Sequence, residues 1–168
     1  CKNMETGAEG WRYKAFPEPR PLFNNAAVAA TDPKTPVIVV EGMKCAESLA
    51  TVIGDRFPIV TWPGGSKAIH KADWTPLQAR RVVVWPDADA PGIDATLVIM
   101  KSLESLACKV AAIIPHDDAP KGWDCADLIQ SGADRATVLN YLKSNKVGAE
   151  DFRRAQEPEP EMPLDETP

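Results

Sequence analysis

Four short apolar runs are the clearest pattern along the middle of the chain. They are rich in valine and isoleucine, and turn-forming residues such as Gly, Pro and Asp bound them. A continuous β-branched run of this length is typical of a strand buried on both faces, as in the centre of a parallel sheet. The pattern therefore predicts four strands, at Val37–Val40, Pro58–Thr61, Val82–Trp85 and Val110–Ile114.

Between these runs, apolar residues recur at helical spacing. One helical pattern ends at Gly54, and a second begins at Pro91, where the first turn of a helix tolerates proline. Two further helices are predicted from Asp124 and from Asp134, which is a suitable N-cap residue. Strands that alternate with helices imply right-handed crossovers and a parallel sheet. We therefore predict an α/β fold with a four-stranded, mostly parallel sheet flanked by helices.

Carboxylates follow two of the predicted strands. Glu41 comes directly after the first run, and Asp87 and Asp89 come after the third. Functional crevices in parallel sheets lie just beyond the carboxyl ends of the strands, so we expect these three side chains to meet there. Converging carboxylates repel each other unless a cation lies among them, which predicts a divalent metal. The structural alternative is an acid at a helix N-terminus for Glu41, and an Asx turn and N-cap for the two aspartates.

A further pair of acids, Asp124 and Asp127, follows the fourth predicted strand. Both residues can cap the helix that begins there. Because they also come after the carboxyl end of a strand, they can equally belong to the same acidic pocket. The sequence leaves these two roles open.

Composition sets the outer limits of this interpretation. With 168 residues, 44% of them hydrophobic, the chain can form one ordinary α/β domain with a core of its own. No apolar stretch approaches the ~20 residues that span a bilayer and no signal peptide opens the chain, so no membrane association is expected. Four cysteines without close sequence spacing favour reduced thiols in a cytoplasmic protein over a zinc site. Because the chain starts at Cys1, we expect it to be a segment of a longer protein.

The two ends of the chain differ from its middle. The net charge of −5 falls entirely within 148–168, where Glu-Pro alternation predicts a disordered acidic tail or linker. Residues 1–147 are neutral, which gives no support to strong non-specific DNA binding through net charge. Residues 1–35 interleave aromatic and basic side chains, including Trp11 and Tyr13. We expect them to form an extended arm packed on the domain, with direct contact to single-stranded nucleic acid as the alternative.

Together these motifs resemble the Toprim domain, a family that includes primases, topoisomerases and some nucleases. The resemblance spans about residues 36–143 and rests on Glu41-Gly42, on a glycine-containing turn after the second strand, and on the Asp-x-Asp-x-x-Gly pattern at 87–92. Lys121–Asp127 is similar to an acidic element of phage and plasmid primases and of primase–helicases, and Pro19–Phe23 to their lead-in. The resemblance implies a Toprim-type, Rossmann-like domain over residues 36–147.

The resemblance also implies an activity: a DNA primase that makes RNA primers on single-stranded DNA by metal-dependent nucleotidyl transfer. Nucleoside triphosphates would be the substrates, and a replicative helicase, separate or fused, the partner. Asp87 and Asp89 are expected to hold Mg²⁺ or Mn²⁺, and Glu41 to complete the coordination or to act as general acid or base. Phosphate contacts, for which a solvated lysine or a tight turn is the alternative, are predicted at Lys44, Gly64, Gly65 and Lys121.

Two other functions would use the same residues. One is a metal-dependent nuclease that cuts a phosphodiester, and the other is a Toprim module that only holds nucleic acid or a replication partner. Met43 stands where the phage and plasmid primases often carry an acidic or polar residue. The 168 residues include neither a zinc-binding module nor a helicase P-loop.

Overall fold

The computed structural model describes residues 16–157 and builds them around one five-stranded sheet. The strand order is β2-β1-β3-β4-β5, in which β1 to β4 are parallel and β5 is antiparallel to β4. The strands are β1 (Val37–Val40), β2 (Ile59–Val60), β3 (Arg81–Trp85), β4 (Lys109–Ile113) and β5 (Lys146–Gly148). The four predicted strands and their mostly parallel arrangement are confirmed, and the short fifth strand adds to them.

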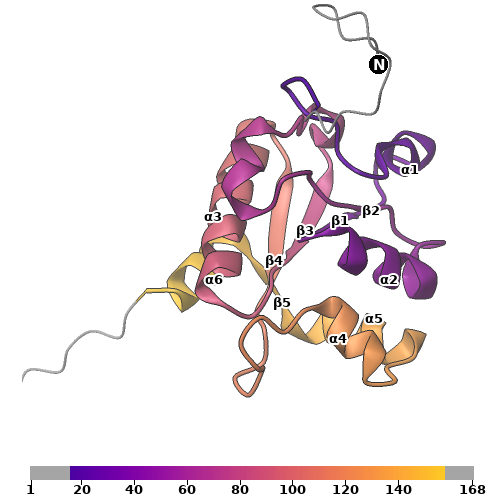
Figure 1. Cartoon of the computed structure of the whole chain (residues 1–168), viewed down its shortest axis with the longest axis vertical. Helices are drawn as coiled ribbons and strands as arrows, with labels where there is room; N and C mark the ends of the chain where they lie inside the picture. Colours follow the sequence, from indigo (N-terminus) through magenta and orange to yellow (C-terminus); the bar gives the residue numbers. More distant parts are fainter. Residues whose placement is uncertain (1–15, 158–168) are drawn as a thin grey trace, which may run out of the picture.

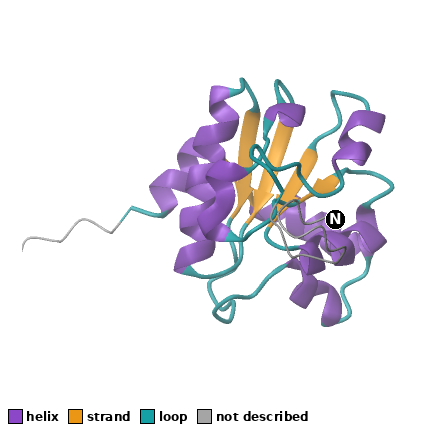
Figure 2. Cartoon of the chain, turned by 45° about the horizontal axis from the view of Figure 1, so that its top comes forward, coloured by secondary structure: helices purple, strands orange, loops and turns teal. Residues whose placement is uncertain are grey.

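Helices cover both faces of this sheet. Figure 1 shows α3 and α6 on one side of the strands and α2, α4 and α5 on the other, and Figure 2 shows the strands between these layers. The α-helices are α1 (Asn25–Ala30), α2 (Met43–Ile53), α3 (Ala90–Ser105), α4 (Cys125–Gln130), α5 (Arg135–Asn145) and α6 (Ala149–Ala155). Two 3-10 helices, η1 (Ser66–Lys71) and η2 (Thr75–Leu77), follow β2. The predicted helix starts at Asp124 and Asp134 are confirmed, since each residue is an N-cap whose side chain accepts backbone N–H bonds.

The burial of the central strand β1 explains why its sequence is apolar at every position. All four of its residues are buried, and they alternate between two separate apolar clusters. Val37 and Val39 pack toward α3, whereas Ile38 and Val40 pack toward α2. A strand covered on both faces has no polar positions, so its sequence is a continuous apolar run.

The segment after Gly148 corrects the prediction of a disordered tail. Residues 149–155 form α6, and the side chain of Phe152 is completely buried in the cluster that also contains residues of α3 and β4. The prediction is therefore wrong for 148–157. One aromatic residue among acids and arginines produces no apolar periodicity, so the sequence pattern could not reveal this helix. Residues 158–168 lie outside the described part of the chain.

The described part of the N-terminal segment, residues 16–35, packs on the domain, but it is not extended throughout. Arg20 and Phe23 form isolated β-bridges with Ala72 and Thr61, and Leu22 is buried. The chain then forms α1, which the sequence did not predict. Trp11 and Tyr13, whose stacking on nucleic acid was the alternative, lie outside the described residues. No helix within residues 16–157 has the length and apolar character needed to cross a membrane.

Candidate metal centre

The parallel pairing of β1 and β3 brings the first acidic residues together. Val40 is paired with Trp85, so the chain leaves the two neighbouring strands at the same level of the sheet. Glu41 follows β1 directly, and Asp87 follows β3 after one proline. The side chains are close enough for the charge of Glu41 to raise the pKa of Asp87. Glu41 and Asp87 therefore lie at the same edge of the sheet, where its strands end.

Asp87 is the electrostatic centre of the site. Burial, together with the negative charges of four other acids, raises the pKa of its carboxyl to about 7. In order of decreasing effect, these acids are Glu41, Asp124, Asp89 and Asp127. A carboxylate surrounded by other carboxylates gains free energy from a bound cation, because the cation offsets both the repulsion and the lost hydration.

Asp89 has a structural role that is compatible with metal binding. It is the N-cap of α3, and its Oδ1 accepts the backbone N–H of Gly92 at 2.8 Å. The capping alternative is therefore correct for this residue, although a carboxylate has a second oxygen that remains available. Gly92 is itself required by close packing, because a Cβ atom there would lie 2.5 Å from the carbonyl oxygen of Asp87. The spacing between Asp89 and Gly92 therefore allows the tight backbone turn that places Asp87 and Asp89 beyond the end of β3.

Asp124 and Asp127 form a reciprocal capping box at the start of α4. Asp124 Oδ1 accepts the backbone N–H groups of Ala126 and Asp127, and Asp127 Oδ2 accepts the N–H of Asp124. The same two residues contribute to the electrostatic environment of Asp87. Their two possible roles therefore do not exclude each other: the cap fixes the orientation of the carboxylates, and the loop position directs them toward the site.

Backbone pairing between two loops explains how Asp124 reaches Asp87. The backbone N–H of Ala88 donates to the carbonyl of Trp123 at 2.8 Å, and the N–H of Gly122 donates to the carbonyl of Ala88 at 3.0 Å. These bonds join the loop after β3 to the loop after β4. The acids of both loops are consequently held on one side of the sheet edge.

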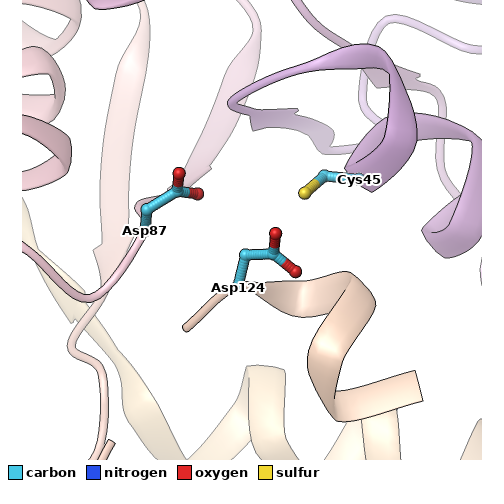
Figure 3. A group of neighbouring side chains, drawn as sticks. All are labelled: Cys45, Asp87 and Asp124. Carbon is cyan, nitrogen blue, oxygen red and sulfur yellow. The ribbon is translucent and has the colours of Figure 1, made fainter. Parts of the chain in front are cut away.

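A cysteine that the sequence analysis did not select lies among these acids. The sulfur of Cys45 and one oxygen each of Asp87 and Asp124 all lie within 4.8 Å of one another, and Figure 3 shows the three side chains directed toward a common space. Cys45 is buried. Cys45 is the third residue of α2, which begins just after β1 ends, so its place beyond a strand end is the signal that could have identified it.

Glu41 lies between the acids and the segment that follows β2. Burial raises the pKa of its carboxyl, the backbone N–H of Ser66 lowers it, and the charge of Asp89 raises it again. Ser66 is the first residue of η1. Glu41 therefore lies near the start of η1 as well as near the loop after β3 that holds Asp87 and Asp89.

The residues predicted to contact phosphate occupy different environments. Lys44 Nζ lies 3.7 Å from Asp124 Oδ2 and 3.6 Å from Asp127 Oδ1, so this lysine is already paired with acids of the site. Gly64 and Gly65 have positive φ angles, and a Cβ at Gly64 would meet that of Ala68 at 2.7 Å, as a tight turn requires. Lys121 is exposed in the loop after β4, without an ion pair inside the described range. Phosphate contact remains a prediction for all four residues.

Among the comparisons with known proteins, the one with solved structures finds similar folds. No protein-family model matches the sequence, and no curated protein matches it either. A DNA primase domain from Pseudomonas aeruginosa is similar to this chain with a TM-score of 0.59 and 17% identity, over 80% of this chain and 41% of that one. The E. coli primase catalytic core is similar with a TM-score of 0.58 and 18% identity, over 83% and 44% of the two chains.

The chain has the fold of part of a DNA primase catalytic core. A third structure, the primase fragment of the bacteriophage T7 primase–helicase, agrees at a TM-score of 0.51 and 16% identity, over 72% of this chain and 48% of that one. The Toprim-like fold predicted from the sequence is thereby confirmed. The chain spans less than half the length of these primase structures.

Asp87 gives the metal-free protein a predictable pH dependence. Its pKa is about 7 in the folded state and 3.8 in an unperturbed carboxyl, so the folded state binds more protons between these values. The free energy of unfolding should therefore fall as the pH rises from about 4 to about 7, by about 1–2 kcal/mol after allowance for solvent screening. Asp87→Asn should flatten this decline.

Urea unfolding at a series of pH values, with a chelator present, measures the effect. Asp117→Asn is the matched control, because Asp117 is exposed in the loop after β4 and should leave the profile as in the wild type. An Asp87→Asn protein with the full wild-type decline would show that another group controls it.

Proposed function

We propose that this chain is the Toprim catalytic domain of a DNA primase and that its site joins ribonucleotides into short RNA primers on single-stranded DNA. One observation carries the proposal. In a fold shared with primase catalytic cores, Glu41, Asp87 and Asp89 converge at the carboxyl edge of the sheet, and Asp124 joins them from a separate loop. Transfer of a nucleotidyl group places negative charge on phosphate oxygens, and carboxylate-bound metal ions are the common means of stabilising it.

The donor set fits a hard divalent cation. Asp87, Asp89 and Glu41 offer only carboxylate oxygens, which are the protein ligands that Mg²⁺ and Mn²⁺ prefer. These acids crowd around a half-buried Asp87, and a bound cation would relieve their mutual repulsion. When bound, Mg²⁺ would position the triphosphate of the incoming nucleotide and stabilise the charge on the transferring phosphorus.

Glu41 is suited to handling the proton of the reaction. Its pKa is raised, chiefly by burial, which brings its protonation equilibrium closer to neutral pH than that of an exposed glutamate. As a general base it would accept the proton of the primer 3′-hydroxyl. The hydroxyl oxygen then forms a bond to the α-phosphorus of the nucleotide while the bond to the pyrophosphate oxygen breaks.

The substrates and partners of this reaction follow from its chemistry. It requires a single-stranded DNA template and nucleoside triphosphates, and we propose a replicative helicase, separate or fused, as the partner that exposes the template. The similarity to the T7 primase–helicase fragment supports that partner. The cytoplasm is the compartment in which we expect this activity.

Primer synthesis from labelled nucleotides on single-stranded DNA tests the proposal in the full-length protein. Short RNA products that depend on template, nucleotides and Mg²⁺ would support it. Cleavage of DNA without added nucleotides would instead indicate a nuclease, and DNA binding without either reaction would indicate a binding module. Either result would overturn primase activity.

Metal binding gives a prediction that needs no activity. Mg²⁺ or Mn²⁺ at about 100 times its Kd should stabilise the folded chain by ~2.7 kcal/mol and raise its melting temperature by roughly 5–10 °C. Asp87→Asn combined with Asp89→Asn should abolish this shift. The control is Asp117→Asn with Asp118→Asn, which removes the same charge from an exposed loop. A shift of wild-type size in the first double variant would refute the assignment of the metal to Asp87 and Asp89.

A further inference from the structure

Cys45 brings a sulfur atom into a site whose other donors are oxygens. The residue is 4% exposed, and its Sγ forms a compact group with carboxylate oxygens of Asp87 and Asp124, all within 4.8 Å of one another. The three residues come from α2, the loop after β3 and the start of α4, and Figure 3 shows that their side chains point toward the same space. Glu41 and Asp89 are outside this group of ligand atoms.

We propose that this group is a second metal position, selective for a thiophilic divalent cation such as Zn²⁺, with Cys45, Asp87 and Asp124 as its protein ligands. The inference rests on the proposed function only through Asp87, which both metal positions share. Thiolate ligands favour zinc-class ions, whereas carboxylates alone favour Mg²⁺ and Mn²⁺. A zinc-class ion in this position would compete with Mg²⁺ for Asp87.

The distances suit a tetrahedral zinc-class ion. Bonds of about 2.3 Å to sulfur and 2.0–2.2 Å to oxygen place tetrahedral ligands roughly 3.3–3.8 Å apart. The group therefore closes with side-chain movements of only about 1 Å. Asp124 is already oriented, because its Oδ1 accepts backbone N–H bonds at 2.7 and 2.9 Å from the first turn of α4. Such bonds are the usual support of a ligand carboxylate.

Water completes the fourth position in this proposal. Cys125 is also buried nearby, but its Sγ donates to the backbone carbonyl of Cys45 at 3.8 Å, and it is not a member of the group. Binding breaks the S–H bond of Cys45, transfers its proton to water and forms the metal–sulfur bond, without a change of oxidation state.

Cobalt titration of the 168-residue chain tests this site directly, because Co²⁺ bound to a thiolate produces a sulfur-to-metal charge-transfer band. The titration uses a background in which Cys1 and Cys108 are serine, with a non-thiol reductant. We expect the band to saturate at a single ion per chain and Zn²⁺ to displace it. Cys45→Ser should remove the band and weaken Zn²⁺ binding by at least about 10–100-fold. Removal of a residue that only hydrogen-bonds to a metal ligand already causes a loss of that size.

Cys125→Ser is the matched control, since it replaces an equally buried thiol and should keep the band. Absence of a band in the parent protein, or a band that survives Cys45→Ser, overturns the inference. Cys45→Ala replaces Cys45→Ser if the latter does not fold. The two metal positions are tested independently: Cys45→Ser should keep the Mg²⁺-dependent rise in melting temperature, and Asp89→Asn should keep the charge-transfer band.

Discussion

Glu41→Gln should reduce primer synthesis by the full-length protein by ~10²–10⁴-fold, which is the usual contribution of a general acid or base. Glutamine preserves the volume of the side chain and can still accept the hydrogen bond of the Ser66 backbone N–H. It cannot accept a proton from the primer hydroxyl, and it removes one charge from the metal site. The loss should therefore appear in turnover without a loss of stability.

Stability should in fact rise slightly in this variant. Glu41 is one of the acids whose charge raises the pKa of Asp87, so its neutralisation removes repulsion from the metal-free site. Glu47→Gln is the control, because Glu47 is exposed on the nearby helix α2 and the substitution makes the same chemical change. Primer synthesis at the normal rate in Glu41→Gln would assign Glu41 to a structural role and favour the binding-module alternative.

Phe152→Ala should destabilise the protein by about 3–5 kcal/mol, a large part of the stability of an ordinary domain. Phe152 is fully buried and is the only residue of α6 that is, so its removal leaves a cavity against β4 and α3. An ion pair at 2.6 Å between Arg153 and Glu104 also joins α6 to α3. Because both partners are partly exposed, it cannot replace the lost burial.

Denaturant unfolding measures this loss, and Phe16→Ala provides the matched control. Phe16 is 63% exposed, so the same truncation there should cost little. Equal stabilities for the two variants would mean that the chain after Gly148 does not pack on the sheet. That result would agree with the disordered tail predicted from the sequence. A loss confined to Phe152→Ala would establish α6 as part of the domain.

The order of strands and helices was predictable because each central element carries its own pattern. The residues of β1 are apolar without interruption, since both faces of the strand are covered, and Asp134 caps α5 through a local bond to Thr137. The acids of the site were predictable for a related reason. In a parallel sheet the carboxyl ends of all strands lie on one edge, so the residues that follow the strands lie together there.

The residue pattern alone therefore predicts four strands, their helices, and acids that follow strand ends. The remaining contacts depend on how the elements pack. Phe152 is buried because β4 offers a surface for it, although its own neighbours are charged. Asp124 meets Asp87 through backbone bonds between loops that are distant in sequence, and Cys45 meets both because α2 begins just beyond the end of β1. Such contacts depend on how whole elements pack, and no local pattern of residue types records them.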